Sequence, residues 1–231
     1  MHLDDLNFMD VEDYLKQDDR ILLVMGACEQ HGYLSLMTDT RIPQVLADAV
    51  SQKSGVLVAP AVNFGVSPYF LTYPGTISLR VSTYLDLVED VVRSLYGQGF
   101  RRFVALNGHG GNAPATARLV ELGNALPDLQ LSWYSWWQAQ RVTETAAQHG
   151  LVSRHAAWIE AFKFCRVTEL PQGEKESFDS HYAVYNAART RAEAGDGVYG
   201  GKYQVSDEIM DELFKVMVED VLDLLKFEKF K

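Results

Sequence analysis

The chain has 231 residues, of which 47% are hydrophobic and 23% are charged, a balance typical of a globular protein with a sizeable core. Its net charge is −10 and its isoelectric point is near 5.0, so its surface repels phosphate backbones and anionic lipids. We therefore expect neither a nucleic acid nor a membrane among its partners.

The two cysteines, Cys28 and Cys165, are too few for a disulfide framework and form no CxxC pair. The first twenty residues are acidic and lack the basic and apolar regions of a signal peptide. No apolar run approaches the roughly 18 residues that a membrane helix needs. These features predict a cytoplasmic protein.

Short apolar runs, which predict strands, alternate along the chain with segments of helical apolar period, which predict helices. Asn112 and Pro114 are placed to begin one further helix, as its cap and in its first turn. In chain order we expect a strand at 21–27, a helix at 43–53, strands at 55–61, 102–106 and 129–135 with a helix at 81–96 between the first two, and helices at 156–167 and 206–227.

Such alternation predicts an α/β fold with a mostly parallel sheet and helices on both faces. No repeat, low-complexity tract or Pro/Gly/Ser linker divides the sequence, so we expect a single domain over residues 1–231. Sites in such folds lie beyond the carboxyl ends of the strands. Two polar segments, 28–39 and 107–112, follow predicted strands, and we expect them at one edge of the sheet.

The first polar segment contains Glu29-Gln30-His31-Gly32, with Asp39 further along. In an extended chain, Glu29 and His31 lie on one face and can share an ion. Asp39 is placed to return as a carboxylate bridging two metals. Carboxylate and imidazole together favour zinc, manganese or iron. The alternative interpretation is a surface loop with a solvated glutamate and an incidental histidine.

The second polar segment, residues 107–112, reads Asn-Gly-His-Gly-Gly-Asn. Its three glycines indicate that the backbone approaches another group closely. The Walker-type phosphate loop pattern is absent, which favours His109 as a metal ligand. The N–H groups of Gly110 and Gly111 could then stabilise an oxyanion. The alternative is a glycine-rich turn that holds a structural histidine.

A third segment contains His155 and Glu160. Glu160 could complete the metal site while His155 acts as an acid or base, because an imidazole titrates near neutral pH. The alternative is a helix-surface glutamate with a capping histidine. In addition, the aromatic run at 133–137 could line a pocket for a flat ring, or belong to the core or to a subunit interface.

Taken together and in this order, the motifs resemble those of the creatininase (creatinine amidohydrolase) family. The resemblance extends from about residue 20 to residue 225. It rests on Gly-Ala-Cys-Glu-Gln-His-Gly at 26–32, Thr-Asp-Thr at 38–40, Pro-Gly-Thr-Ile-Ser at 74–78, Asn-Gly-His-Gly-Gly-Asn at 107–112, the His155–Glu160 segment and Gly-Val-Tyr-Gly at 197–200.

This resemblance implies a three-layer α/β/α sandwich that holds two divalent metal ions, zinc first, with manganese or iron as alternatives. Glu29 and His109 would bind one ion, His31 and Glu160 the other, and Asp39 would lie between them. A metal-activated hydroxide would then cleave a C–N bond in a small amide, lactam or formamide. Family members commonly form hexamers, so a homo-oligomer is expected.

The same resemblance leaves His155 to protonate the leaving nitrogen. Three departures from the family pattern stand out. The loop at 33–37 lacks a second histidine, Gly110-Gly111 replaces an aromatic residue and a glutamate of creatininases proper, and Ala161-Phe162 replaces Thr-Ser. Creatinine itself is therefore not the expected substrate. Two other functions stay open: a metal-stabilised assembly or binding subunit, and a metal-dependent hydrolase or lyase of another bond, such as one in a cyclic ketone.

Overall fold

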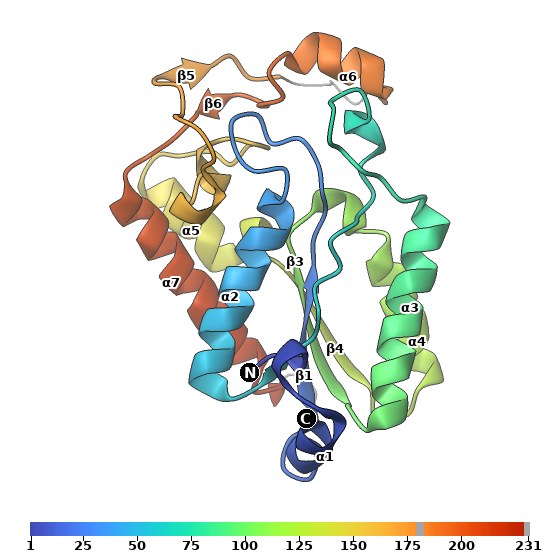
Figure 1. Ribbon diagram of the computed structural model, residues 1–231. Helices are drawn as coiled ribbons and strands as arrows, with labels where there is room; N and C mark the ends of the chain where they lie inside the picture. The colour runs from blue at the N-terminus through green and yellow to red at the C-terminus, as the bar shows by residue number, and fades with distance from the viewer. Residues whose placement is uncertain (179–182, 229–231) are drawn as a thin grey trace.

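A computed structural model describes residues 1–178 and 183–228 (Figure 1). At its centre lies a sheet of parallel strands in the order β2-β1-β3-β4. The strands are β1 (Arg20–Met25), β2 (Leu57–Val58), β3 (Arg102–Asn107) and β4 (Gln130–Ser135). The four predicted strands are thus present, and β2 is shorter than the expected run at 55–61.

Helices follow the strands, and a small antiparallel hairpin is formed by β5 (Glu174–Lys175) and β6 (Gly201–Lys202). Three helices, Phe8–Leu15, Gln140–Gln148 and Ala187–Ala194, were not predicted from the sequence. The α-helices are α1 (Phe8–Leu15), α2 (Thr38–Ser54), α3 (Val81–Gln98), α4 (Ala115–Ala125), α5 (Gln140–Gln148), α6 (Ala187–Ala194) and α7 (Asp207–Leu224). None of them, within the described ranges, is long and apolar enough to cross a membrane.

Each face of the sheet has its own hydrophobic core, because alternate strand residues point to opposite sides. Leu22 and Val104 belong to the core that also contains residues of α2, α5 and α7. Leu23 and Phe103 belong to the core formed with α3 and α4. Figure 1 shows these two sets of helices on opposite sides of the sheet. The predicted three-layer α/β/α sandwich is therefore confirmed.

Helix α2 begins at Thr38, five residues before the predicted start, and includes Pro43. Proline has no N–H to donate to the carbonyl four residues earlier, which belongs to Asp39. Gly108 packs against this carbonyl so closely that a Cβ on residue 108 would lie 1.9 Å from it. The loop after β3 is thereby held against the first turn of α2, where Asp39 lies.

The predicted helix at 156–167 is wrong. Ala156 has a φ of 57°, in the left-handed region that a right-handed helix excludes. The chain instead forms two short 3-10 turns, Trp158–Glu160 and Lys163–Cys165. His155 and Glu160 therefore come from an irregular segment, which directs both side chains toward the same site.

The prediction that Asn112 caps a helix is also wrong. Pro114 occupies the cap position of α4, and no side chain caps that helix. The side-chain amide of Asn112 instead donates to the carbonyl of Gly26 across 3.1 Å. This buried bond ties the loop after β3 to the end of β1, so the two polar segments meet as expected.

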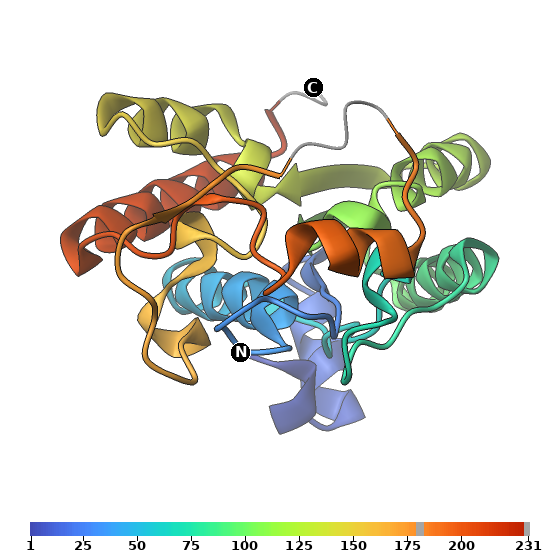
Figure 2. The same cartoon turned by 90° about the horizontal axis from the view of Figure 1, so that it is seen from above.

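A segment described at 171–178 and 183–205, with β5, α6 and β6, lies over the carboxyl ends of the strands (Figures 1 and 2). Lys175 fixes its shape, since its ammonium group donates to the carbonyls of Ala194 (2.5 Å) and Val198 (2.7 Å) and pairs with Asp196. A bond from the hydroxyl of Tyr73 to the carbonyl of Gly195 (3.2 Å) holds it from below. The segment thus covers the edge where the polar motifs gather.

Candidate metal centre

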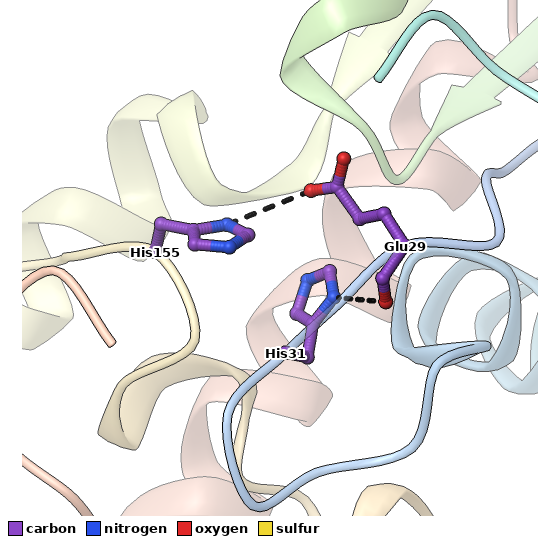
Figure 3. A group of neighbouring side chains, drawn as sticks. All are labelled: Glu29, His31 and His155. Carbon is purple, nitrogen blue, oxygen red and sulfur yellow. Dashed lines mark hydrogen bonds and ion pairs between the residues drawn. The ribbon is translucent and has the colours of Figure 1, made fainter. Parts of the chain in front are cut away.

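Glu29 and His31 lie in the loop after β1, and both side chains are buried. Nδ1 of His31 is 3.2 Å from the backbone carbonyl oxygen of Glu29 (Figure 3). A carbonyl oxygen can only accept, so this nitrogen carries the proton of the neutral ring. Nε2 of His31 therefore has a free lone pair, which is directed toward other members of the site.

His109 follows β3, and a backbone carbonyl also holds its ring, but through Nε2 instead of Nδ1. Its Nε2 lies 2.9 Å from the carbonyl of Val66 and 3.2 Å from the hydroxyl of Ser67. Nδ1 of the neutral ring is then free to act as a ligand. Backbone carbonyls commonly orient metal-binding histidines in this way. No sequence signal pointed to Val66 or Ser67.

Asp39 lies between the two histidines. Its Oδ1 is 3.0 Å from Nε2 of His31, and its Oδ2 is 2.9 Å from Nδ1 of His109. Despite these distances, neither Oδ2 of Asp39 nor Nε2 of His31 has a hydrogen-bond partner, and Oε2 of Glu29 has none. Buried polar atoms without partners cost about 1–3 kcal/mol each. Their convergence fits atoms arranged to ligate a cation.

Glu160 approaches the same group from the irregular segment. Its Oε1 is 3.7 Å from Nε2 of His31, and its Oε2 accepts a hydrogen bond from the backbone N–H of Ala156 across 2.6 Å. The left-handed conformation of Ala156 is part of the turn that aims this donor. A backbone N–H group thus orients the carboxylate of Glu160. In the family pattern a hydroxyl of Thr-Ser is available for this role, but Ala161-Phe162 stands there in this chain.

The five residues expected as ligands form two groups of three, Glu29 with Asp39 and His109, and His31 with Asp39 and Glu160. The candidate ligand atoms of each group lie within 4.8 Å of one another. Two carboxylates with one imidazole form a donor set that suits zinc or manganese. The described residues therefore fit a centre of two ions that share Asp39.

Charge and burial together set the protonation of this cluster. Burial alone would lower the pKa of His109, but the carboxylates of Glu29 and Asp39 outweigh it and raise that pKa to about 9. His31 shows the same balance, and Asp39 and Glu160 raise its pKa well above the usual range. For Asp39 burial is outweighed by the two histidines, which lower its pKa. A cation must therefore displace protons from this site.

His155 stands beside these groups, with Nδ1 3.8 Å from Oε1 of Glu29 (Figure 3). Its Nε2 lies 2.9 Å from the side-chain nitrogen of Gln30. The amide of Gln30 has a defined orientation, because its oxygen accepts from the N–H of Gly32 (3.1 Å) and its nitrogen donates to the carbonyl of Gly197 (3.0 Å). Nε2 of His155 therefore accepts, and the proton of the ring lies on Nδ1, facing Glu29.

Aromatic side chains fix the ring of His155 in place. It stacks on Phe70 with 4.7 Å between the ring centres and meets the edge of Tyr199 at 5.0 Å. Burial and the neighbouring His31 lower the pKa of His155 well below its usual range, so the ring is neutral. The roles of Gln30, Phe70 and Tyr199 were not predicted from the sequence, because no motif spacing connects these residues to His155.

Gly110 and Gly111 begin the 3-10 turn Gly110–Asn112. A Cβ on Gly111 would lie 1.9 Å from the carbonyl oxygen of Val66 and 2.5 Å from Nε2 of His109, so only glycine fits. There is consequently no room for a glutamate at this position. Within the described chain, no hydrogen bond uses the N–H of Gly110 or Gly111, and both residues line a cavity.

This cavity, of about 600 Å³, opens beside Glu29, Asp39 and His109. The residues that line it include six with aromatic rings: Tyr69, Phe70, Trp137, Phe178, Tyr185 and Tyr199. Trp137 is the part of the predicted aromatic run that reaches the cavity, whereas Trp136 is buried in the core. Of the alternatives for the aromatic run, the pocket wall therefore applies to Trp137 and the core to Trp136.

Fold and site together define an α/β protein with a buried carboxylate–imidazole cluster at the carboxyl edge of a parallel sheet. The family model for creatininase, described as creatinine amidohydrolase, matches residues 4–225. The chain belongs to the creatininase family, as the sequence motifs predict.

Three curated relatives differ in what they act on. The chain is 32% identical over 102 residues to 3-dehydro-scyllo-inosose hydrolase of Thermotoga maritima (43% of this chain, 33% of the relative). It is 29% identical over 129 residues to creatinine amidohydrolase of Pseudomonas putida (51% and 50%). It is 38% identical over 109 residues to mycofactocin precursor peptide peptidase of Mycolicibacterium smegmatis (44% of each). The chain spans half or less of the length of these relatives.

Solved structures match over nearly the whole chain. A crystal structure of creatinine amidohydrolase (creatininase) has a TM-score of 0.81 at 25% identity, covering 98% of this chain and 97% of that one. A structure described as creatininase Mn has a TM-score of 0.79 at 24% identity, with 98% of both chains covered. A mutant creatininase described as Zn–Zn type has a TM-score of 0.78 at 24% identity, covering 98% and 97%. These matches support the α/β/α fold.

Proposed function

We propose that this protein is a metal-dependent amidohydrolase that cleaves the C–N bond of an amide. One observation carries the proposal: Asp39 faces His31 and His109 across 3.0 and 2.9 Å, while backbone carbonyls hold the other nitrogen of each ring. Such fixed imidazoles next to a shared carboxylate favour metal binding over a simple ion pair.

In this proposal Glu29, Asp39 and His109 hold one divalent ion, and Asp39 with the other two ligands holds a second. Zinc is the first expectation, with manganese or iron as alternatives. When bound, such ions lower the pKa of a water molecule and polarise an amide carbonyl. The matched creatininases described as manganese and Zn–Zn forms support this choice of metals.

The other residues of the site act on the substrate. The N–H groups of Gly110 and Gly111 donate to the carbonyl oxygen as negative charge develops on it. To protonate the leaving nitrogen, the neutral ring of His155 must first gain a proton, which the attacking water would supply as it is deprotonated; the imidazolium would then donate from Nδ1, the ring atom that faces the site. Gln30 and Phe70 hold that ring, and the aromatic walls of the cavity exclude water from it.

The amide belongs either to a small molecule or to a peptide. The sequence favours small amides, but one relative is named as a peptidase, which widens the range to peptide bonds. A second candidate function is hydrolysis of a bond in a cyclic ketone. The relative named 3-dehydro-scyllo-inosose hydrolase favours it, because the same ligands would serve that reaction. We also propose a single domain and a cytoplasmic location, as the sequence predicts, and a homo-oligomer such as a hexamer, as the family resemblance implies.

A paired experiment tests the proposed function. Protein loaded with zinc or manganese is screened against formamides, lactams, cyclic ureas, N-acyl amino acids, short peptides and cyclic ketones, with metal content measured in parallel. His109→Ala is compared with His149→Ala, a histidine that pairs with Glu212 away from the site. We expect His109→Ala to lose bound metal and turnover together and His149→Ala to retain both.

The remaining outcomes separate the alternatives. Turnover of an amide by His109→Ala at the wild-type rate would contradict the proposed function. Turnover of cyclic ketones without any cleavage of C–N bonds would favour the second candidate. Metal binding and an intact oligomer, with no turnover by the wild-type protein, would favour a non-catalytic assembly subunit.

A further inference from the structure

The cavity beside the candidate metal centre contains a cation that the proposed chemistry does not use. Of its described lining residues, Arg154 is the only lysine or arginine. Arg154 immediately precedes His155 in the chain, and both side chains line the cavity. Consecutive Cα atoms are about 3.8 Å apart, so the guanidinium group originates next to the proton donor of the proposed reaction.

Arg154 has no partner within the described part of the chain. Its guanidinium group makes neither an ion pair nor a hydrogen bond there, and its side chain is exposed. Within the described residues, the other arginines are bound to a carboxylate or a carbonyl, except Arg80, which lies outside the cavity. The carboxylates that line the cavity, those of Glu29, Asp39 and Glu160, approach histidines instead.

A guanidinium group is built to bind one class of ligand. Its planar fork of N–H donors matches a carboxylate, to which it forms two parallel hydrogen bonds. The cavity that Arg154 lines is also lined by the aromatic residues Tyr69, Trp137, Phe178 and Tyr185. Their rings suit an apolar or aromatic group. The cavity therefore offers an anion site and an apolar site side by side, next to the metal centre.

We propose that the substrate is an amide whose leaving amine carries a carboxylate beside an apolar or aromatic side chain, and that Arg154 binds this carboxylate. An N-acyl amino acid and the carboxyl-terminal residue of a peptide both present this chemistry. The position of Arg154 beside His155 assigns the anion to the half of the substrate that leaves. This inference rests on the proposed function for the reaction, but the binding of the anion is testable without it.

Two ligands that differ only in charge test the anion site. N-acetyl-L-phenylalanine carries the carboxylate and its methyl ester does not, so their dissociation constants are compared by calorimetry on the metal-loaded protein. A hydrogen-bonded ion pair of this kind is worth about tenfold or more in affinity. We expect the acid to bind at least about tenfold more tightly than the ester, and Arg154→Gln to abolish that difference.

Matched variants separate Arg154 from other causes. Arg154→Lys should retain part of the preference, because it keeps the charge but loses the fork. Arg80→Gln removes a guanidinium group that lies outside the cavity and has no partner among the described residues, and it should change neither dissociation constant. A preference for the acid that survives in Arg154→Gln would show that the carboxylate binds elsewhere, including at a metal, and would overturn the inference. Equal binding of acid and ester by the wild-type protein would also overturn it.

Hydrolysis assays then distinguish the two sources of the carboxylate. Release of phenylalanine is compared for N-acetyl-L-phenylalanine and for a hexapeptide ending in phenylalanine, each with a neutral counterpart. Cleavage of the carboxylate-bearing substrates that is indifferent to Arg154→Gln, and no faster than cleavage of their neutral counterparts, would leave the proposed function intact and refute this inference. Binding of the acid that depends on Arg154, without hydrolysis of any amide, would refute the proposed function and retain the anion site.

Discussion

The side-chain amide of Gln30 donates a hydrogen bond to Nε2 of His155 across 2.9 Å, and this contact determines which ring nitrogen carries the proton. Because Nε2 accepts, the ring proton lies on Nδ1, 3.8 Å from Oε1 of Glu29. Among the described residues, Gln30 does not line the cavity, and its side-chain amide bonds to His155, Gly197 and Gly32 rather than to a candidate metal ligand. It acts as a positioning residue.

Replacing Gln30 with glutamate tests this role. The carboxylate can only accept, so it would draw the proton of His155 to Nε2 and would face the carbonyl of Gly197. We expect Gln30→Glu to lower kcat by about 10²-fold, the scale of a lost general acid, with a smaller change in KM and an altered pH profile. Gln17→Glu, an exposed site, should leave these unchanged. If Gln30→Glu lowered kcat only together with the free energy of unfolding, and the pH profile did not change, Gln30 would have a purely structural role.

Gly111→Ala tests the close approach of the loop after β3. The new methyl group would meet the carbonyl of Val66 and Nε2 of His109, so we expect a loss of about 1–3 kcal/mol in unfolding free energy. Metal affinity should fall as well, because His109 must shift. The matched control is Gly123→Ala in α4, where a Cβ meets nothing within 4 Å. That change should raise stability by about 0.5–1 kcal/mol. Equal stabilities of the two variants in denaturant titration would contradict the packing.

The metal-free protein should lose stability as the pH rises. The pKa of His109 is about 9 in the folded chain and near 6.5 when unfolded, so the folded state binds more protons between these values. The stabilisation is complete below pH 6.5 and is lost as the pH approaches 9, by up to about 3 kcal/mol for His109 alone. Chemical denaturation in the presence of a chelator measures this slope, and His109→Gln should flatten it. A wild-type stability that rises from pH 6.5 to 9 would contradict the assignment.

Much of the fold could be predicted from the sequence because its strands are short apolar runs that stop at polar loops. The strands at 20–25, 102–107 and 130–135 needed only local composition to be recognised. The predicted start of α2, at residue 43, lies five residues after the observed start at Thr38. Proline commonly marks the beginning of a helix, but Pro43 is accommodated inside this one. The helix at 156–167 failed because the left-handed conformation of Ala156 is imposed by tertiary contacts, including its bond to Glu160.

Some residues of the candidate site could likewise be predicted from the sequence, and others could not. Glu29, His31 and His109 carry motif patterns whose residue types indicate metal chemistry, and the structure brings them together with the other expected ligands. The residues that orient them carry no such pattern. Val66 acts through a backbone carbonyl, which any residue would supply, and Gln30 reaches His155 across 125 positions in the sequence. Contacts of this kind depend on the folded chain and have no local signature.

Metal stoichiometry tests the central claim most directly. Protein stripped with a chelator is titrated with zinc and with manganese, and bound metal is counted per chain for the wild type and for Asp39→Asn. Because Asp39 belongs to both groups of candidate ligands, we predict about two ions per chain in the wild type and a loss of affinity at both positions in the variant. Fewer than about one ion per chain in the wild type, or two ions still bound tightly by Asp39→Asn, would contradict the shared centre.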